Sequence, residues 1–379
     1  MNKINIYKIA LGIAVLCLLV AFGFVIAGHA ESAGPFFVSF FIALAFSFRG
    51  YASLKGFAYT VTIFAAVTMA MYYPQYFVRW GDFKLSLLIT PLIQLIMFGM
   101  GTSMGIDDFV GVVKTPRGVA IGVVSHFIIM PLIGFTLAKL ASSANIEPEI
   151  AAGIILIGCS PNGMASNVIS YLAKANLALS ITITAVSTML APFVTPFLMK
   201  MLAGAFVEID AVNMMWDIIK MVIVPIGAGI VFNKLFSGKS KWLDTAMPLV
   251  SMFGIAFIIV IITAAGRDSL LKIGPLLILL VLIHNLSGYT LGYWTGRLFK
   301  MEERDCRTMA IEVGMQNGGL ASGLANQMGK MATVGLAPAI FGPLMNVTGS
   351  ILASYWHRKP PKEDNISKDN MGEVPVPET

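Results

Sequence analysis

The sequence predicts an all-α polytopic membrane protein, because its composition suits lipid better than water. Of the 379 residues, 57% are hydrophobic and 12% are charged, and the mean hydropathy is +0.80. A soluble globular chain carries about 25% charged residues, so this chain has too few to cover a surface in contact with water. Long apolar stretches between charged or Gly- and Pro-rich breaks are typical of membrane helices. This composition argues against soluble enzymes, disordered proteins and DNA-binding domains, and we expect no nucleic-acid partner.

Twelve apolar stretches are candidate membrane spans. A helix rises about 1.5 Å per residue, so about 20 residues cross the hydrocarbon core of a bilayer, and the shortest stretch barely does. The apolar run that ends at Ala27 is longer than a signal-peptide core, which favours a retained helix. The stretches cover residues 6–27, 34–48, 56–74, 85–104, 118–139, 149–172, 177–198, 214–235, 246–265, 274–296, 308–328 and 334–356.

The positive charges predict how these spans cross the membrane. With the N-terminus inside, most of the 26 Lys and Arg residues fall on the inner side, where such residues concentrate in membrane proteins. We therefore expect a multi-pass protein of the inner cell membrane, surrounded by lipid, with both termini in the cytoplasm. Residues 357–379 are polar and without periodicity, which predicts a disordered cytoplasmic tail. The sequence does not indicate the oligomeric state.

The second half of the chain resembles the first. The segment HFIIMPLIGFTLAKLA, which starts at His126, is followed by GCSPNGMASN. The segment HNLSGYTLGYWTGRLF, which starts at His284, is followed by EVGMQNGGLASG. Interrupted apolar spans at corresponding positions of two halves indicate the binding site of a repeat-built transporter. Five spans per half would leave the two halves inverted in the membrane.

Among the acidic residues, Glu312 says most about which functions are possible. Nearly all of the 20 Asp and Glu residues fall in loops, in the tail or at helix ends, but Glu312 lies inside the eleventh span. A carboxylate there costs at least ~2.5 kcal/mol on insertion scales, so it should face a partner or a cavity. A bound cation or a proton is the natural partner. The alternative is that Glu312 lies near a helix end, since Arg307 is close before it.

The residues around Glu312 offer oxygen ligands for an alkali cation. The glycines and amides after it would unwind the backbone, which is tolerated at that depth only where protein or water satisfies it. Freed carbonyls, amides and a carboxylate are hard-oxygen ligands that suit Na⁺. The matching segment and the next span add Ser166, Asn167, Ser180 and Thr184. The alternative for the last two is that their hydroxyls only bond carbonyls of their own helix. Half-helix N-termini at the interruptions would suit an anionic substrate.

Four strings of this sequence resemble the bile acid:sodium symporter family: IMFGMG (96–101), GCSPNGMASNVISYLAKAN (158–176), EVGMQNGGLA (312–321) and NVTGSILASYW (346–356). The resemblance covers roughly residues 54–356. It implies a ten-helix inverted-repeat transporter fold with two broken crossing helices, in which a panel of four helices moves against a core of six. The repeats would be residues 54–200 and 210–356, and residues 1–53 would form an extra N-terminal membrane hairpin.

The resemblance also implies two sodium sites. The first would use Ser166, Asn167, Ser180, Thr184 and Glu312. The second would use Glu312, Gln316 and the carbonyls of Val313 and Met315. Family members add a glutamine to the second site, and here His126 stands in its place. His126 is then either a core side chain that only forms hydrogen bonds, or the sign of a single Na⁺ with proton-sensitive coupling, because an imidazole is a poor Na⁺ ligand.

Together these features predict a sodium-coupled symporter that imports an organic anion by alternating access. By resemblance, the substrate contacts would be Met164, Asn317 and Asn346, and the anion a bile acid, a pantoate-like acid or a keto acid. Na⁺ is then the transported ion, and we expect no organic cofactor. The main alternative is a proton-coupled carrier of the same fold, which His126 favours. An intramembrane enzyme is a weaker alternative, because the chain has no HExxH motif and no Ser/His/Asp set. A channel is also weaker, because interrupted helices paired across two repeats favour a carrier.

Overall fold

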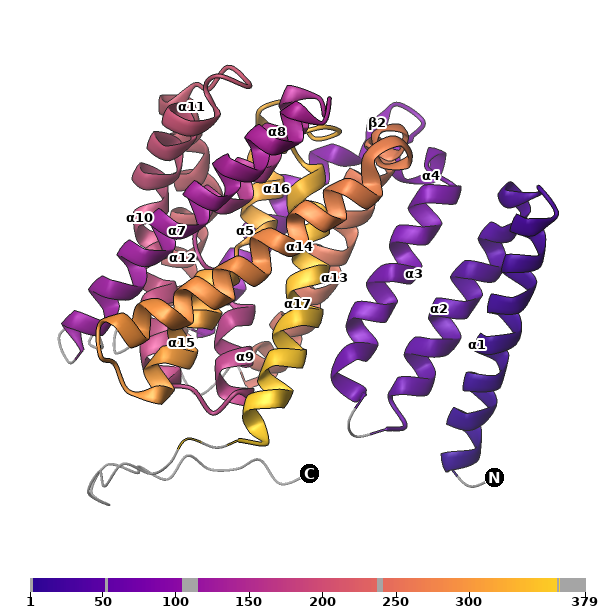
Figure 1. Cartoon of the computed structure of the whole chain (residues 1–379), viewed down its shortest axis with the longest axis horizontal. Helices are drawn as coiled ribbons and strands as arrows, with labels where there is room; N and C mark the ends of the chain where they lie inside the picture. The colour runs from indigo at the N-terminus through magenta and orange to yellow at the C-terminus, as the bar shows by residue number, and fades with distance from the viewer. Residues whose placement is uncertain (1–2, 52–53, 104–114, 237–240, 360, 362–379) are drawn as a thin grey trace.

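The computed structural model describes residues 3–51, 54–103, 115–236, 241–359 and 361, and over these ranges the chain is a bundle of helices (Figure 1). Its strands there form a single hairpin of β1 (Arg79–Trp80) and β2 (Phe83–Lys84). Eight helical stretches within the described residues are long and apolar enough to cross a membrane. The prediction of an all-α polytopic membrane protein is confirmed. Residues 360 and 362–379 of the predicted tail lie outside the described residues.

The first elements are a helical hairpin and two further spans. The hairpin contacts the rest of the bundle mainly through its second helix, which packs against the third, while α1 lies at the edge (Figure 1). In chain order these elements are α1 (Lys3–Ile26), η1 (Ala30–Ala33), α2 (Gly34–Phe48), η2 (Lys55–Phe57), α3 (Ala58–Tyr72), α4 (Gln75–Val78), the β hairpin, η3 (Leu85–Leu88) and α5 (Ile89–Ser103).

The remaining helices form the body of the bundle, and most of them are long. In chain order they are α7 (Pro116–Ser143), α8 (Pro148–Cys159), α9 (Ala165–Leu172), α10 (Leu177–Ala203), α11 (Ala211–Ile218), the π-helical turn η4 (Ile219–Ile223), α12 (Val224–Phe236), α13 (Lys241–Ala265), α14 (Arg267–Leu298), α15 (Glu303–Gly314), α16 (Gly318–Gln327) and α17 (Leu336–His357). Each of the twelve predicted stretches is helical over most of its length.

Two of the predicted spans are broken in the middle, and the breaks cross each other. The span from 149 to 172 is split into α8 and α9 around Pro161, and the span from 308 to 328 is split into α15 and α16. Proline has no backbone N–H to continue a helix. An antiparallel bridge joins Asn162 to Gln316, and the Asn317 N–H donates to the Pro161 carbonyl at 2.8 Å. A Cβ on Gly163 would lie 2.7 Å from the Gln316 carbonyl oxygen, so this close approach requires glycine.

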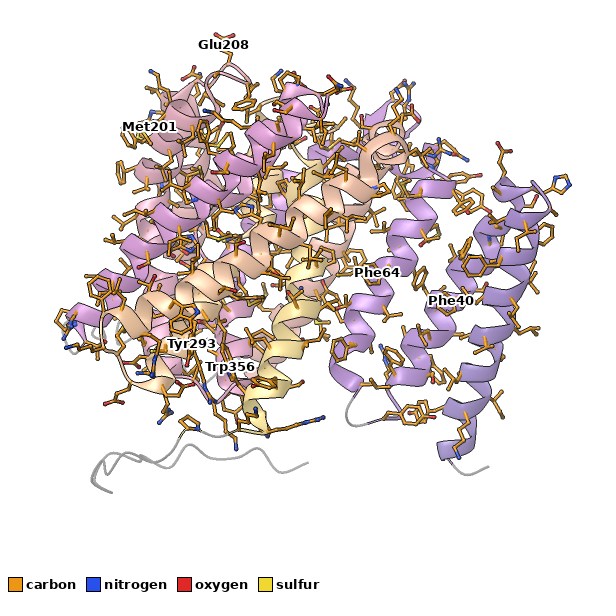
Figure 2. The ribbon with its side chains drawn as sticks, in the orientation of Figure 1. Phe40, Phe64, Met201, Glu208, Tyr293 and Trp356 are labelled. Atoms are coloured by element: carbon orange, nitrogen blue, oxygen red, sulfur yellow. The ribbon has the colours of Figure 1, made fainter. Side chains whose placement is uncertain are left out.

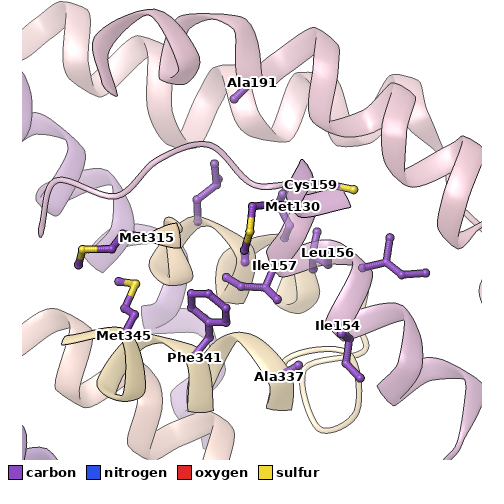
Figure 3. Packing of buried hydrophobic residues seen from close by; sticks show 14 of the residues in the cluster. Met130, Ile154, Leu156, Ile157, Cys159, Ala191, Met315, Ala337, Phe341 and Met345 are labelled. Atoms are coloured by element: carbon purple, nitrogen blue, oxygen red, sulfur yellow. The ribbon is translucent and has the colours of Figure 1, made fainter. Parts of the chain in front are cut away.

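Apolar side chains surround the crossing of the broken spans. Figure 3 shows the packing of Ile154, Leu156 and Ile157 from α8 near Phe341 from α17 and Met130 from α7. All five side chains are fully buried. Any polar group held at this depth is therefore cut off from bulk water and must find its partners within the protein or in a bound ligand.

Candidate ion and substrate site

The carboxylate of Glu312 is fully buried beside α10. Its Oε1 accepts a hydrogen bond from the Ser180 hydroxyl at 2.5 Å, and its Oε2 accepts one from the Thr184 hydroxyl at 2.9 Å. Ser180 and Thr184 lie one turn apart on α10, so both hydroxyls reach the same face of the helix. They bond side chains of other helices rather than the carbonyls of their own helix.

The first turn of α9 completes this group of oxygens. The Asn167 Oδ1 accepts from Ser180 at 2.9 Å and from Thr184 at 3.3 Å, and the Ser166 Oγ lies 3.3 Å from the Thr184 Oγ1. The structure thus brings together all five residues that the resemblance assigned to a first sodium site. It adds Ser170, whose Oγ lies 3.1 Å from that of Ser180. We call these six residues the Glu312 oxygen cluster: Ser166, Asn167, Ser170, Ser180, Thr184 and Glu312.

No cationic side chain balances Glu312 in the part of the chain that the structure describes. The ion pairs found there join other residues, all nearer the ends of the bundle. A buried charge without a partner is costly, so the oxygen cluster calls for a bound cation or a proton. The donor set of one carboxylate, one amide oxygen and several hydroxyls fits a hard cation such as Na⁺.

The second predicted set of ligands lies at the end of α15, and protein donors already occupy part of it. The Val313 carbonyl accepts from the Gln316 Nε2 at 3.0 Å. The Glu312 carbonyl accepts from the Asn162 Nδ2. Met315 follows as the buried C-cap of α15. The Asn162 Oδ1 and the Gln316 Oε1 are buried without a hydrogen-bond partner among the described residues.

His126 joins the ends of both half-helices at the crossing. The buried imidazole has its Nε2 2.9 Å from the Ser160 carbonyl oxygen, at the end of α8. Its Nδ1 lies 3.1 Å from the Glu312 carbonyl oxygen, on α15. The ring thus contacts the main chain of Glu312 rather than its carboxylate. His284, at the corresponding place on α14, lies in the apolar core with its Nε2 2.9 Å from the Met130 carbonyl oxygen.

Sequence reasoning missed Asn162 and Ser170. Asn162 bridges to Gln316 and bonds Glu312, and its side chain is fully buried. A signal for it was available, because the pair Asn162-Gly163 of the first interrupted segment recurs as Asn317-Gly318 in the second. Ser170 lies one turn after Ser166 on α9, so the helical spacing could have placed both hydroxyls on one face.

The three predicted substrate contacts line one cavity of about 110 Å³. Met164 and Asn317 lie at the N-termini of α9 and α16, and Asn346 comes from α17. The Asn317 Oδ1 accepts from the Leu320 N–H at 3.0 Å and so caps α16. Isoleucines and a methionine of α5 and α13 form the opposite wall, and the lining contains no charged side chain: Ile93, Ile96, Met97, Ile255 and Ile259 are examples of that wall.

A family model and the relatives found by sequence comparison point to the same family. Residues 90–273 match the model of the sodium bile acid symporter family. The chain is 40% identical over 287 residues to the uncharacterized sodium-dependent transporter YocS of Bacillus subtilis, which covers 76% of this chain and 88% of that protein. It is 32% identical over 271 residues to a probable sodium/metabolite cotransporter, the chloroplastic BASS1 of Arabidopsis thaliana, covering 72% of this chain and 67% of that protein. The rice protein of the same name is also 32% identical, over 282 residues, covering 73% and 69%.

Proposed function

The chain belongs to the sodium bile acid symporter family, and on this premise we propose that it imports a small organic anion together with Na⁺ by alternating access. The observation that carries the proposal is the fully buried Glu312 carboxylate, which hydroxyl and amide side chains surround and which no cationic side chain balances in the described residues. Such a group needs a cation each time the site closes. A transported ion supplies that charge and couples its own movement to the conformational cycle.

The proposed Na⁺ site is the Glu312 oxygen cluster. Its side chains come from α9, α10 and α15, so one bound ion would hold three helices together at the crossing. Without the ion, the carboxylate would favour an arrangement that lets in water or a proton. Na⁺ thus stabilises the arrangement in which the neighbouring cavity accepts its substrate.

We further propose that one Na⁺, rather than two, binds in each cycle. At the second predicted place, Asn162 and Gln316 direct amide N–H groups at the carbonyls of Glu312 and Val313. The His126 ring fills the space between the ends of α8 and α15. These amide donors occupy the two carbonyl oxygens, so a second cation would have to displace them; the oxygens left for it are the Asn162 Oδ1 and the Gln316 Oε1, which are buried without a hydrogen-bond partner among the described residues.

The substrate is proposed to be a small carboxylate, such as a pantoate-like or keto acid, rather than a bile acid. Drug-sized ligands occupy pockets of roughly 300–1,000 Å³, whereas this cavity measures about 110 Å³. The cavity wall carries no charged residue. The N-termini of α9 and α16 meet there, and the positive ends of these two helix dipoles favour an anionic carboxylate.

The moving parts proposed for alternating access are two groups of helices. The panel would consist of α3, α5, the span from α11 to α12, and α13, and the core of α7 to α10 and α14 to α17. The repeats 54–200 and 210–356 would each supply half of both groups. Since α1 begins and α17 ends at the same end of the bundle (Figure 1), we propose that both termini face the cytoplasm from an inner membrane.

The decisive experiment compares Glu312→Gln with wild type in vesicles. Uptake of a keto acid, a pantoate-like acid and a bile acid is measured with and without an inward Na⁺ gradient. Glutamine keeps the size of the side chain but removes the charge that Na⁺ balances, so Na⁺-stimulated uptake should be abolished. Glu208→Gln, on an exposed loop (Figure 2), is the matched control and should behave as wild type. Equal uptake by Glu312→Gln and wild type, with or without Na⁺, would refute the proposal.

A proton-coupled carrier is the second candidate, because His126 stands at the crossing in contact with both half-helices. Replacing Na⁺ by choline at constant pH separates the two. A carrier driven by protons keeps its uptake in choline and follows the pH gradient, whereas a sodium symporter loses its uptake in choline.

A further inference from the structure

A pair of hydrogen-bonded residues lies close to the oxygen cluster and joins the same two helices. The backbone N–H of Asn176 donates to the Thr308 Oγ1 at 2.9 Å. The Thr308 hydroxyl in turn lies 3.0 Å from the Asn176 carbonyl oxygen, to which it can donate. Asn176 is the N-cap of α10, Thr308 is on α15, and the Thr308 side chain is fully buried. The Thr308 hydroxyl therefore contacts both main-chain polar groups of Asn176. The Arg304 carbonyl, one turn earlier on α15, lies 3.1 Å from the Thr308 hydroxyl and accepts from the Asn176 N–H at 3.3 Å.

The side chain of Asn176 is held as firmly as its main chain. Its Oδ1 accepts from the Leu179 N–H at 3.1 Å, which caps the first turn of α10. Its Nδ2 donates to the Asp305 Oδ1 at 2.8 Å, one turn of α15 before Thr308. The residue that starts α10 is thus also fastened to two successive turns of α15.

The spacing along both helices relates this pair to the ion site. Ser180 is four residues after Asn176 on α10, and Glu312 is four residues after Thr308 on α15. Four residues advance a helix by about 6 Å, which is close to one turn. The Ser180–Glu312 hydrogen bond of 2.5 Å therefore lies one turn beyond the Asn176–Thr308 pair, between the same two helix faces.

We infer that Thr308 and Asn176 are positioning residues that fix α15 against α10, so that the hydroxyls of the oxygen cluster reach the Glu312 carboxylate. The inference rests on the proposed function, in which that cluster binds Na⁺. A shift or rotation of α15 that breaks the Asn176–Thr308 pair also changes the Ser180–Glu312 distance. α15 has only 12 residues and ends at the break after Gly314, so the crossing end has no continuous helix to hold it and depends on this anchor.

A second contact supports the anchor. Arg307 is almost fully buried, and its guanidinium donates to the Ala173 carbonyl at 3.2 Å and to the Trp356 carbonyl at 3.3 Å. It thereby ties the first turns of α15 to the ends of α9 and α17. Trp356 also stacks with Tyr293, with ring centroids 6.0 Å apart (Figure 2). The first turns of α15 are thus held by more contacts of this kind than its last turn.

Thr308→Val tests the inference, because valine keeps the shape of threonine and removes its hydroxyl. The half-saturating Na⁺ concentration should rise about five-fold, the size expected for one lost hydrogen bond. It is read both from uptake and from the thermal stabilisation of the purified protein by Na⁺ alone. Thr308→Ser retains the hydroxyl and should keep the wild-type value. Thr290→Val is the matched control, since that exposed hydroxyl bonds only its own helix.

The outcomes separate the inference from the proposed function. A purely structural role for Thr308 would lower the melting temperature without Na⁺ and leave the half-saturating Na⁺ concentration unchanged, which overturns the inference. If Thr308→Val does not fold, Asn176→Ser serves instead, because serine keeps the N-cap but loses the amide that reaches Asp305. An unchanged Na⁺ requirement in that variant also overturns the inference. A wild-type protein with no response to Na⁺ would instead refute the proposed function.

Discussion

At the scale of single residues, the proposal of one Na⁺ per cycle rests largely on the imidazole of His126. It is buried between two carbonyl oxygens that belong to different half-helices, those of Ser160 and Glu312. A neutral imidazole carries one N–H and no oxygen, so it donates to only one of these two carbonyls and is a poor ligand for Na⁺. The Asn162 Nδ2 lies 3.1 Å from its Nδ1. On this proposal, a second Na⁺ binds poorly beside His126 because of the chemistry of the imidazole. The place itself is buried and has carbonyl oxygens.

His126→Gln is predicted to change the shape of the Na⁺ dependence. Wild-type uptake should rise hyperbolically with Na⁺, as one ion requires. Glutamine adds an amide oxygen beside the Glu312 carbonyl, which should allow a second Na⁺ to bind. Uptake by the variant should then rise with Na⁺ along a steeper, sigmoidal curve. His29→Gln, at an exposed position, is the control and should stay hyperbolic. A sigmoidal curve in the wild type would contradict the proposal of one Na⁺ per cycle.

At the scale of elements, apolar length predicted the spans, and the helix-breaking residues predicted the two interruptions. The long helices extend further than their apolar cores. The predicted stretch 118–139 became α7 (Pro116–Ser143), and 274–296 became α14 (Arg267–Leu298), because polar residues continue a helix beyond the lipid. The pattern of apolar and helix-breaking residues alone could not predict that the two breaks cross, and only the family resemblance implied it. The Asn162–Gln316 bridge joins residues far apart in the sequence, and no local periodicity reports such a contact.

Even a methyl group added at Gly163 is predicted to disturb the packing of the two broken spans where they cross. In Gly163→Ala, the new Cβ would lie 2.7 Å from the Gln316 carbonyl oxygen, and because that atom is backbone, one of the broken segments must move. We expect a loss of about 1–3 kcal/mol of stability and strongly reduced uptake even at saturating Na⁺. Thermal unfolding and uptake are measured beside Gly227→Ala, where nothing lies within 4 Å. Wild-type behaviour of Gly163→Ala would show that the crossing tolerates displacement.

At the scale of the whole molecule, the hairpin of α1 and α2 lies at the edge of the bundle and packs on it through α3 (Figure 1). Its contact with the bundle is apolar and aromatic, for example between Phe41 and Phe64, whose ring centroids are 6.0 Å apart. Much of α1 is exposed, including Leu16 and Leu19. The sequence predicted that the hairpin exists but offered no role for it, because a helix that only faces lipid and one neighbour needs no polar residue to mark its function.

Removal of residues 1–53 is therefore predicted to leave transport intact. The surface of α3 that becomes exposed is apolar and would meet lipid instead of water, so the variant loses packing contacts but gains no unfavourable hydration. Uptake per inserted molecule and the half-saturating Na⁺ concentration should equal those of the full chain, with a lower melting temperature in detergent. The oxygen cluster and the cavity take no residue from the hairpin, which gives the expectation its physical basis. Normal insertion combined with lost uptake would mean that the hairpin moves with α3 during the cycle and belongs to the transporting unit.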